Sequence, residues 1–135
     1  MPKPMRTKSV SLIQARAYAS KSQEFSDAAE SELTSGRFIA ACSLAIHAGI
    51  NAADAVCGAR LGQRAAGEDH DQVLVLLGQS GLDGGEVERE LRRLLPLKTK
   101  AEYEPDDIAE SVATKAVERG VRCAQIAFRV VASMN

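Results

Sequence analysis

The stretch RFIAACSLAIHAGINAADA, residues 37–55, decides the fold of this chain. Its side chains are apolar or small at nearly every position, on all sides of a helix with 3.6 residues per turn. A helix of this kind needs neighbours around its whole circumference, because its apolar surface would otherwise contact water. We therefore predict a central helix from about Arg37 to Arg60, ended by Gly62.

The segments on both sides of this stretch also carry helical patterns. From Leu12 to Leu33 one face stays small or apolar, and Thr34-Ser35-Gly36 then ends the helix. A last helix from about Ile108 to Ser133, with Pro105 or the nearby aspartates as its cap, has a seam of small residues. That seam is Ala109, Ala113, Ala116, Gly120, Ala124, Ala127 and Val131.

Two further helices are predicted in the middle of the chain. Asp69 and Gln72 have the spacing of a capping box and open a short helix. Gly78–Gly85 contains four glycines and predicts a loop, after which another helix starts near Glu86. Pro96 falls inside that helical pattern, so the helix should kink or restart there.

The composition agrees with closely packed helices. Alanine, the best helix former, occurs 22 times in 135 residues, whereas Phe and Tyr together occur five times and Trp is absent. No segment alternates with a period of two, so we expect no sheet. The expected fold is all-α: an up-and-down four-helix bundle with an additional short helix, as one domain over residues 10–135 after a flexible tail of residues 1–9.

Charge, apolar runs and cysteines exclude several classes. Seventeen basic against 18 acidic residues give a formal charge of −1, which excludes a basic coat for nucleic acid but not a local patch. Apolar runs fall far short of a membrane span, and no secretion signal is recognisable, so we expect a cytoplasmic protein without membrane contact. Cys42, Cys57 and Cys123 are expected to be reduced core thiols.

A polar stripe interrupts the apolar central helix. Ser43, His47, Asn51 and Asp54 follow one another at spacings of four, four and three residues, so they share one helix face. Three interpretations stay open: a hydrogen-bonded network inside the bundle, a face turned to solvent, or the lining of a ligand pocket.

A second polar feature follows Pro96. Lys98, Lys100 and Tyr103 place two cations and an aromatic ring within six residues, before an acidic turn. They form either a binding surface for an anion or a solvated helix end, where lysines are favoured by the helix dipole.

Common catalytic motifs are absent from the sequence. There is no Glu-x-x-His pair for a di-iron site, no phosphate-binding Gly-rich loop and no nucleophile elbow. With only two histidines, His47 and His70, we expect no metal site and no cofactor.

The order of these features resembles the HEPN superfamily of small helical bundles. The resemblance covers about Leu33–Phe128: the small-residue helix of residues 37–55, Asp69-His70-Asp71, Leu91-x-x-Leu94, Lys98-x-x-Ala101-Glu102-Tyr103 and the Ala-rich last helix. It implies a homodimer with a cleft between protomers. It also implies a nucleotide, an RNA or an antitoxin-like protein as partner, as in toxin–antitoxin or defence pairs.

The nuclease signature of that superfamily, Arg followed by His after four to six residues, is incomplete here. The arginine corresponds to Lys98, and no histidine follows it. RNA cleavage without metal needs a group that exchanges protons near neutral pH, usually histidine. His47 meets this need only if its helix faces the same site as Lys98.

We therefore expect a module without catalytic residues that binds its ligand through Lys98, Lys100 and Tyr103, joined by His47, Asn51 and Asp54. The first alternative is a divergent ribonuclease toxin that uses His47, Lys98 and Tyr103. The second is a purely structural dimerisation protein whose polar stripe is a buried network.

Overall fold

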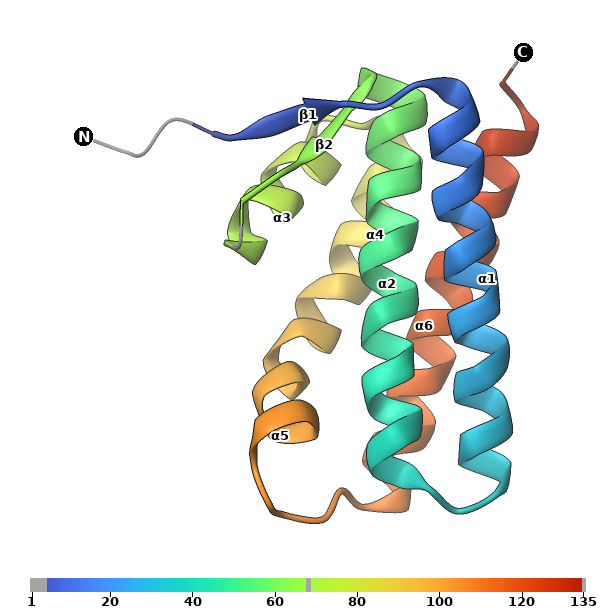
Figure 1. The fold of residues 1–135 in the computed structure, drawn as a ribbon, viewed down its shortest axis with the longest axis vertical. Helices are drawn as coiled ribbons and strands as arrows, with labels where there is room; N and C mark the ends of the chain where they lie inside the picture. Colours follow the sequence, from blue (N-terminus) through green and yellow to red (C-terminus); the bar gives the residue numbers. More distant parts are fainter. Residues whose placement is uncertain (1–4, 68, 135) are drawn as a thin grey trace.

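The computed structural model describes residues 5–67 and 69–134, and it is a helical bundle (Figure 1). Four long helices alternate in direction along the chain, so the expected bundle is confirmed. They are α1 (Leu12–Thr34), α2 (Phe38–Leu61), α4 (Gly81–Leu94) and α6 (Glu110–Ala132). Shorter elements, described below, connect α2 to α4 and α4 to α6.

Helix α2 is the core of the bundle, as its sequence predicts. It packs against α1, α6, α4 and α5, and more than half of its residues are buried. Gly120 of α6 lies against the backbone of Ala45, where an added Cβ would come within 2.9 Å of the Ala45 carbonyl oxygen. The small-residue seam of α6 is therefore used for packing inside this chain.

By length and composition alone, α2 is also apolar enough to cross a membrane, contrary to the expectation that the apolar runs fall far short of a span. Its most apolar window has a mean hydropathy of 1.4, and 61 % of that window is buried inside the bundle. The central helix of a globular bundle has the same composition, because neighbouring helices replace water on every side.

A two-stranded antiparallel sheet contradicts the expectation that the chain has no strands. Strand β1 (Thr7–Ser9) pairs with β2 (Gln63–Ala65), so residues 7–9 do not belong to a flexible tail; residues 1–4 lie outside the described part. Strands of three residues are too short for alternation to show in a sequence. The pairing is anchored where the Val10 amide donates to the Gly62 carbonyl, at 2.9 Å.

The expected loop over Gly78–Gly85 is also wrong. Helix α3 (His70–Gly78) is followed by only two residues before α4 begins at Gly81, which adopts a left-handed φ of +77°. Gly84 lies against the Leu77 carbonyl, a contact that leaves no room for a Cβ. These glycines allow α3 and α4 to approach closely and do not open a loop.

The caps were predicted in part. Asp69 caps α3 by accepting from the Asp71 amide at 2.9 Å, but the Gln72 side chain accepts from the Arg6 amide, so the reciprocal bond of a capping box is missing. The expected restart at Pro96 is confirmed by the 3₁₀ turn η1 (Leu95–Leu97) and by α5 (Lys98–Tyr103). The N-cap of α6 is Ala109, so the predicted cap by Pro105 or an aspartate is wrong.

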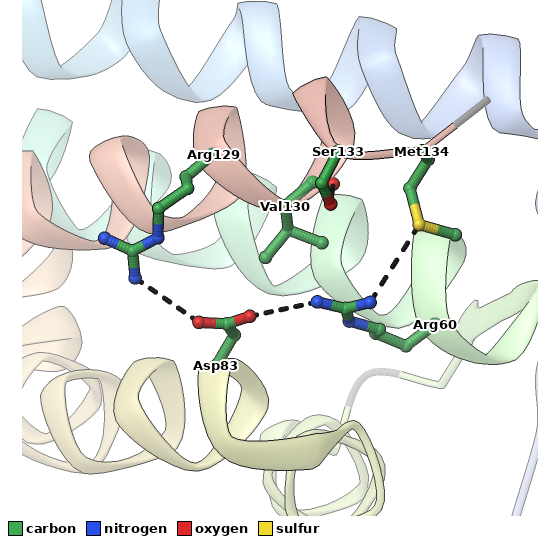
Figure 2. Close-up of polar contacts among 6 residues, drawn as sticks. All are labelled: Arg60, Asp83, Arg129, Val130, Ser133 and Met134. Atoms are coloured by element: carbon green, nitrogen blue, oxygen red, sulfur yellow. Dashed lines mark hydrogen bonds and ion pairs between the residues drawn. The ribbon is translucent and has the colours of Figure 1, made fainter.

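Asp83 ties three long helices together at one end of the bundle. Figure 2 shows its carboxylate between Arg60 of α2, at 3.0 Å, and Arg129 of α6, at 3.3 Å. Because Asp83 lies in the first turn of α4, the positive end of that helix dipole also favours its charge.

Candidate binding site around Glu102

Glu102 of α5 joins two of the residues that the sequence singled out. Its Oε1 lies 3.3 Å from Nε2 of His47 and accepts from the Ser43 hydroxyl at 3.5 Å, while its Oε2 lies 3.8 Å from Nζ of Lys98. The Glu102 side chain is only 16 % exposed. We call Ser43, His47, Lys98 and Glu102 the Glu102 cluster.

The local sequence explains why these side chains meet. Pro96 ends the regular part of α4 and lets the chain restart as α5, whose Ala101 is buried. Lys98 and Glu102 are four residues apart on α5, so they lie on one helix face, as Ser43 and His47 do on α2. Packing of α5 on α2 brings the two faces together.

His47 is held from two sides and remains accessible. Its ring stacks on Phe25 of α1, with 5.3 Å between the ring centroids, and its Nε2 faces Glu102. The side chain is nevertheless 41 % exposed. An imidazole fixed between an aromatic ring and a carboxylate can donate a hydrogen bond to an anion or exchange a proton with a ligand.

Asn51 and Asp54, the other two residues of the polar stripe, do not belong to the Glu102 cluster. The Asn51 side chain donates to the His47 carbonyl at 2.8 Å and is almost buried, so it bonds to its own helix. Burial raises the pKa of Asp54 to about 6, although the positive charges of Arg64 and Lys21 oppose this shift. Asp54 therefore faces β2 and α1, and the structure does not bring it into the Glu102 cluster.

Lys100 and Tyr103 lie at the surface of α5. Lys100 is exposed and the Tyr103 side chain is 74 % exposed. Within residues 5–67 and 69–134, neither side chain makes a hydrogen bond or an ion pair, in contrast to Lys98. They are available to a ligand that extends beyond the cluster.

Two residues near this site were missing from the sequence prediction. Glu102 could have been found from its i,i+4 spacing to Lys98, but its contact with His47 depends on tertiary packing. The other is His70, at the start of α3. Burial lowers the pKa of His70 and the charge of Lys98 lowers it further, against the opposing charges of Asp69, Glu102 and Asp71. His70 is therefore within electrostatic reach of the same cluster.

A surface hollow of about 740 Å³ adjoins the cluster and shares Ser43 with it. The first turn of α2 lines one side, with Arg37, Phe38 and Ile39, and Ala101 of α5 lines another. No side chain caps the N-terminus of α2, so this turn offers backbone N–H groups and the positive end of a long helix dipole.

Among the described residues, neither a metal site nor a reactive thiol is found. Among them, no three His, Cys, Asp or Glu side chains come together in a way that could hold a metal ion. The three cysteines are free and buried, as expected. Burial raises the pKa of Cys57 to about 11 and that of Cys123 to about 12, so these thiols stay protonated and are poor nucleophiles.

No protein-family model matches the chain, and no curated protein matches it in sequence. Its function must therefore be argued from the site itself.

Proposed function

We propose that this protein is a HEPN-like helical module that binds a nucleotide or an RNA strand at the Glu102 cluster and the adjoining hollow. One observation carries the proposal: Ser43 belongs both to the cluster and to the hollow, so cations, an imidazole and an open space lie next to one another. The helical bundle and the order of its elements support the HEPN-like assignment.

The chemistry of the hollow suits a phosphate-bearing ligand. The Arg37 guanidinium is largely exposed, but it lies 3.5 Å from a carboxylate oxygen of Glu32, so a phosphate must compete with Glu32 for it. The uncapped start of α2 offers N–H groups that favour phosphate oxygens. Phe38 and Ile39 supply apolar surface for a base, and Lys98 adds a second positive charge beside Glu102, the residue that Ser43 contacts. Asp107 also lines the hollow, and its carboxylate can accept hydrogen bonds from a base or a ribose.

Titration of a 5′-labelled single-stranded oligoribonucleotide at low ionic strength, followed by fluorescence anisotropy, tests this proposal. Lys98→Ala and Arg37→Ala should each weaken binding at least fivefold without lowering the melting temperature, and Tyr103→Ala should weaken it less. Arg122→Ala removes one exposed positive charge on α6, outside the hollow, and serves as the matched control. Equal affinities for all four variants and the wild type would refute the proposal.

A specific observation also favours the ribonuclease alternative. His47 lies beside the same carboxylate as Lys98, which is the arrangement that His47 needs to act as the general base. In that reaction His47 would accept the proton of a ribose 2′-hydroxyl while the 2′-oxygen attacks the adjacent phosphorus. The bond from phosphorus to the 5′-oxygen breaks, the leaving 5′-oxygen takes a proton from water, and Lys98 stabilises the negative charge on the phosphate.

An RNA cleavage assay without divalent metal separates the two functions. If the protein is a ribonuclease, His47→Ala abolishes cleavage and relieves any growth defect on expression, while RNA binding persists. Intact RNA and harmless expression of the wild type would rule out the ribonuclease and leave binding as the only function of the two.

A further inference from the structure

A groove on another side of the bundle, between α1 and α6, has no role in the proposed ligand site. Its volume is about 680 Å³. Ala19 and Val131 form an apolar floor, and Phe128 stands in it with 64 % of its surface exposed. Together with the apolar floor, Phe128 gives this groove apolar surface that a protein partner could cover.

The exposed surface continues along one stripe of α1. Ile13, Arg16, Ser20, Gln23 and Asp27 follow one another at spacings of three or four residues, so they share one face. Ile13 is 78 % exposed and extends the apolar surface beyond the groove itself.

The charges on this face are arranged so that two copies of the face can pair with each other. Arg16 lies at one end of the groove, and Glu24 and Asp27 lie at the other end. The midpoint between Arg16 and the acidic positions falls between Ser20 and Ser22. A two-fold axis through this midpoint, perpendicular to α1, would set Arg16 of one copy opposite Glu24 and Asp27 of a second copy.

Phe128 lines the same groove as these charged residues. The Arg16 guanidinium donates to the Met134 carbonyl at 3.0 Å, just beyond the end of α6, and so ties this end of α6 to the first turns of α1. The two helices run in opposite directions (Figure 1), so residues of α6 before this end lie beside residues of α1 that follow Arg16. An axis near Ser20, in the middle of the groove, would therefore set the Phe128 side chain of each copy against the groove of the other.

We propose that the α1–α6 groove is the interface of a homodimer with a two-fold axis near Ser20. The partner that fills the groove is a second copy of this chain, because Arg16 of each copy can pair with Glu24 and Asp27 of the other. The small-residue seam of α6 is already used inside the chain at Ala45, so it does not compete for this role. The inference is independent of the ligand proposal, since the Glu102 cluster lies on α2 and α5.

Sedimentation velocity of the full chain at tens of micromolar tests the interface. The wild type should sediment as a dimer, and Phe128→Glu should weaken the dimer at least tenfold with an unchanged circular dichroism spectrum. Leu82→Glu is the matched control, because Leu82 is 90 % exposed on α4, outside the groove, and its variant should stay dimeric. A monomeric wild type, or a dimer that persists in Phe128→Glu, overturns the proposal.

Charge reversal and crosslinking test the symmetry. Asp27→Arg should weaken the dimer, and adding Arg16→Glu should restore it, because the two residues face each other across the axis. Ser20→Cys should form a disulfide between copies on mild oxidation, with little background since the natural cysteines are buried. Ser31→Cys, on the same face eleven residues further along, should not; equal crosslinking of both variants, or of neither, overturns the proposed axis.

Discussion

At the scale of single residues, Glu102 decides how much positive charge the site offers. Its carboxylate faces both His47 and Lys98, so part of the attraction that these groups could exert on a phosphate is spent inside the chain. A ligand phosphate must compete with Glu102 or bind where the two partners remain exposed. Glu102 therefore determines both where His47 and Lys98 lie and how strongly they attract a phosphate.

Replacing Glu102 by Gln should strengthen binding of the labelled oligoribonucleotide by about two- to tenfold, because one negative charge disappears next to two donors. Because the Gln carbonyl can still accept from His47 and Lys98, and both of these partners are partly exposed, stability should fall by no more than about 1 kcal/mol. Glu104→Gln is the control: Glu104 is exposed and forms no ion pair among the described residues, so its effect should be smaller. Weaker binding by Glu102→Gln would mean that the carboxylate itself contacts the ligand.

Asp54 should make the stability of the protein depend on pH. Its pKa is about 6 in the folded chain, above the ordinary value of 3.8, so the folded state holds a proton that the unfolded state releases between these values. Stability should therefore fall by roughly 1–3 kcal/mol as the pH rises from about 4 to above 6.

The substitution Asp54→Asn removes this ionisation. Urea unfolding should show the variant to be more stable than the wild type at pH 7.5, by roughly 1–2 kcal/mol, with no such gain at pH 4. The same difference at both pH values would contradict the assignment to Asp54.

The polar stripe shows what residue spacing can and cannot predict. Helical periodicity correctly puts Ser43, His47, Asn51 and Asp54 along one side of α2. It does not reveal that the Asn51 side chain bonds to the His47 carbonyl of its own helix, because spacing does not fix a side-chain rotamer. Nor does it reveal that Asp54 faces Arg64 and Lys21, because these residues come from other parts of the fold. Glu102 was missing from the prediction for the same reason.

At the scale of elements, two helical glycines should respond to alanine in opposite ways. A Cβ on Gly120 would come within 3.1 Å of three Ala45 atoms, two of them backbone atoms that cannot move aside, whereas a Cβ on Gly85 meets nothing within 4 Å. Gly120→Ala should destabilise the fold by about 1–3 kcal/mol. Gly85→Ala should stabilise it by up to about 1 kcal/mol, since alanine favours helix. Urea unfolding that gives both variants the same sign would contradict the close packing of α2 on α6.

The long helices, the short helix α3 and the restart after Pro96 were predicted from the sequence, whereas the two strands and the start of α4 were not. The predicted bounds of α2, about Arg37 to Arg60, differ by one residue at each end from those observed, because a long apolar run leaves no other choice. The strands β1 and β2 and the early start of α4 were missed. Three-residue strands carry no period, and the glycines before Glu86 have the composition of a loop until α3 packs against them.

At the scale of the whole molecule, Asp83 links the ends of α2, α4 and α6 through Arg60 and Arg129 (Figure 2). Asp83→Asn should lower the free energy of unfolding by about 1 kcal/mol, less at 1 M salt, because both pairs are partly exposed. Glu88→Gln, which removes one pair with Arg92 within α4, should cost less than about 0.5 kcal/mol. Equal effects of the two substitutions would show that Asp83 does not act as a link between helices.

The central claim is that the Glu102 cluster and the hollow beside it bind a nucleotide or RNA. Native mass spectrometry of the purified protein at low ionic strength, with and without added oligoribonucleotide, tests it most directly. We predict a stoichiometric complex with the wild type that is lost in Lys98→Ala and Arg37→Ala and kept in Arg122→Ala. A protein that stays free of RNA, or a complex that survives the loss of both Lys98 and Arg37, would contradict the claim.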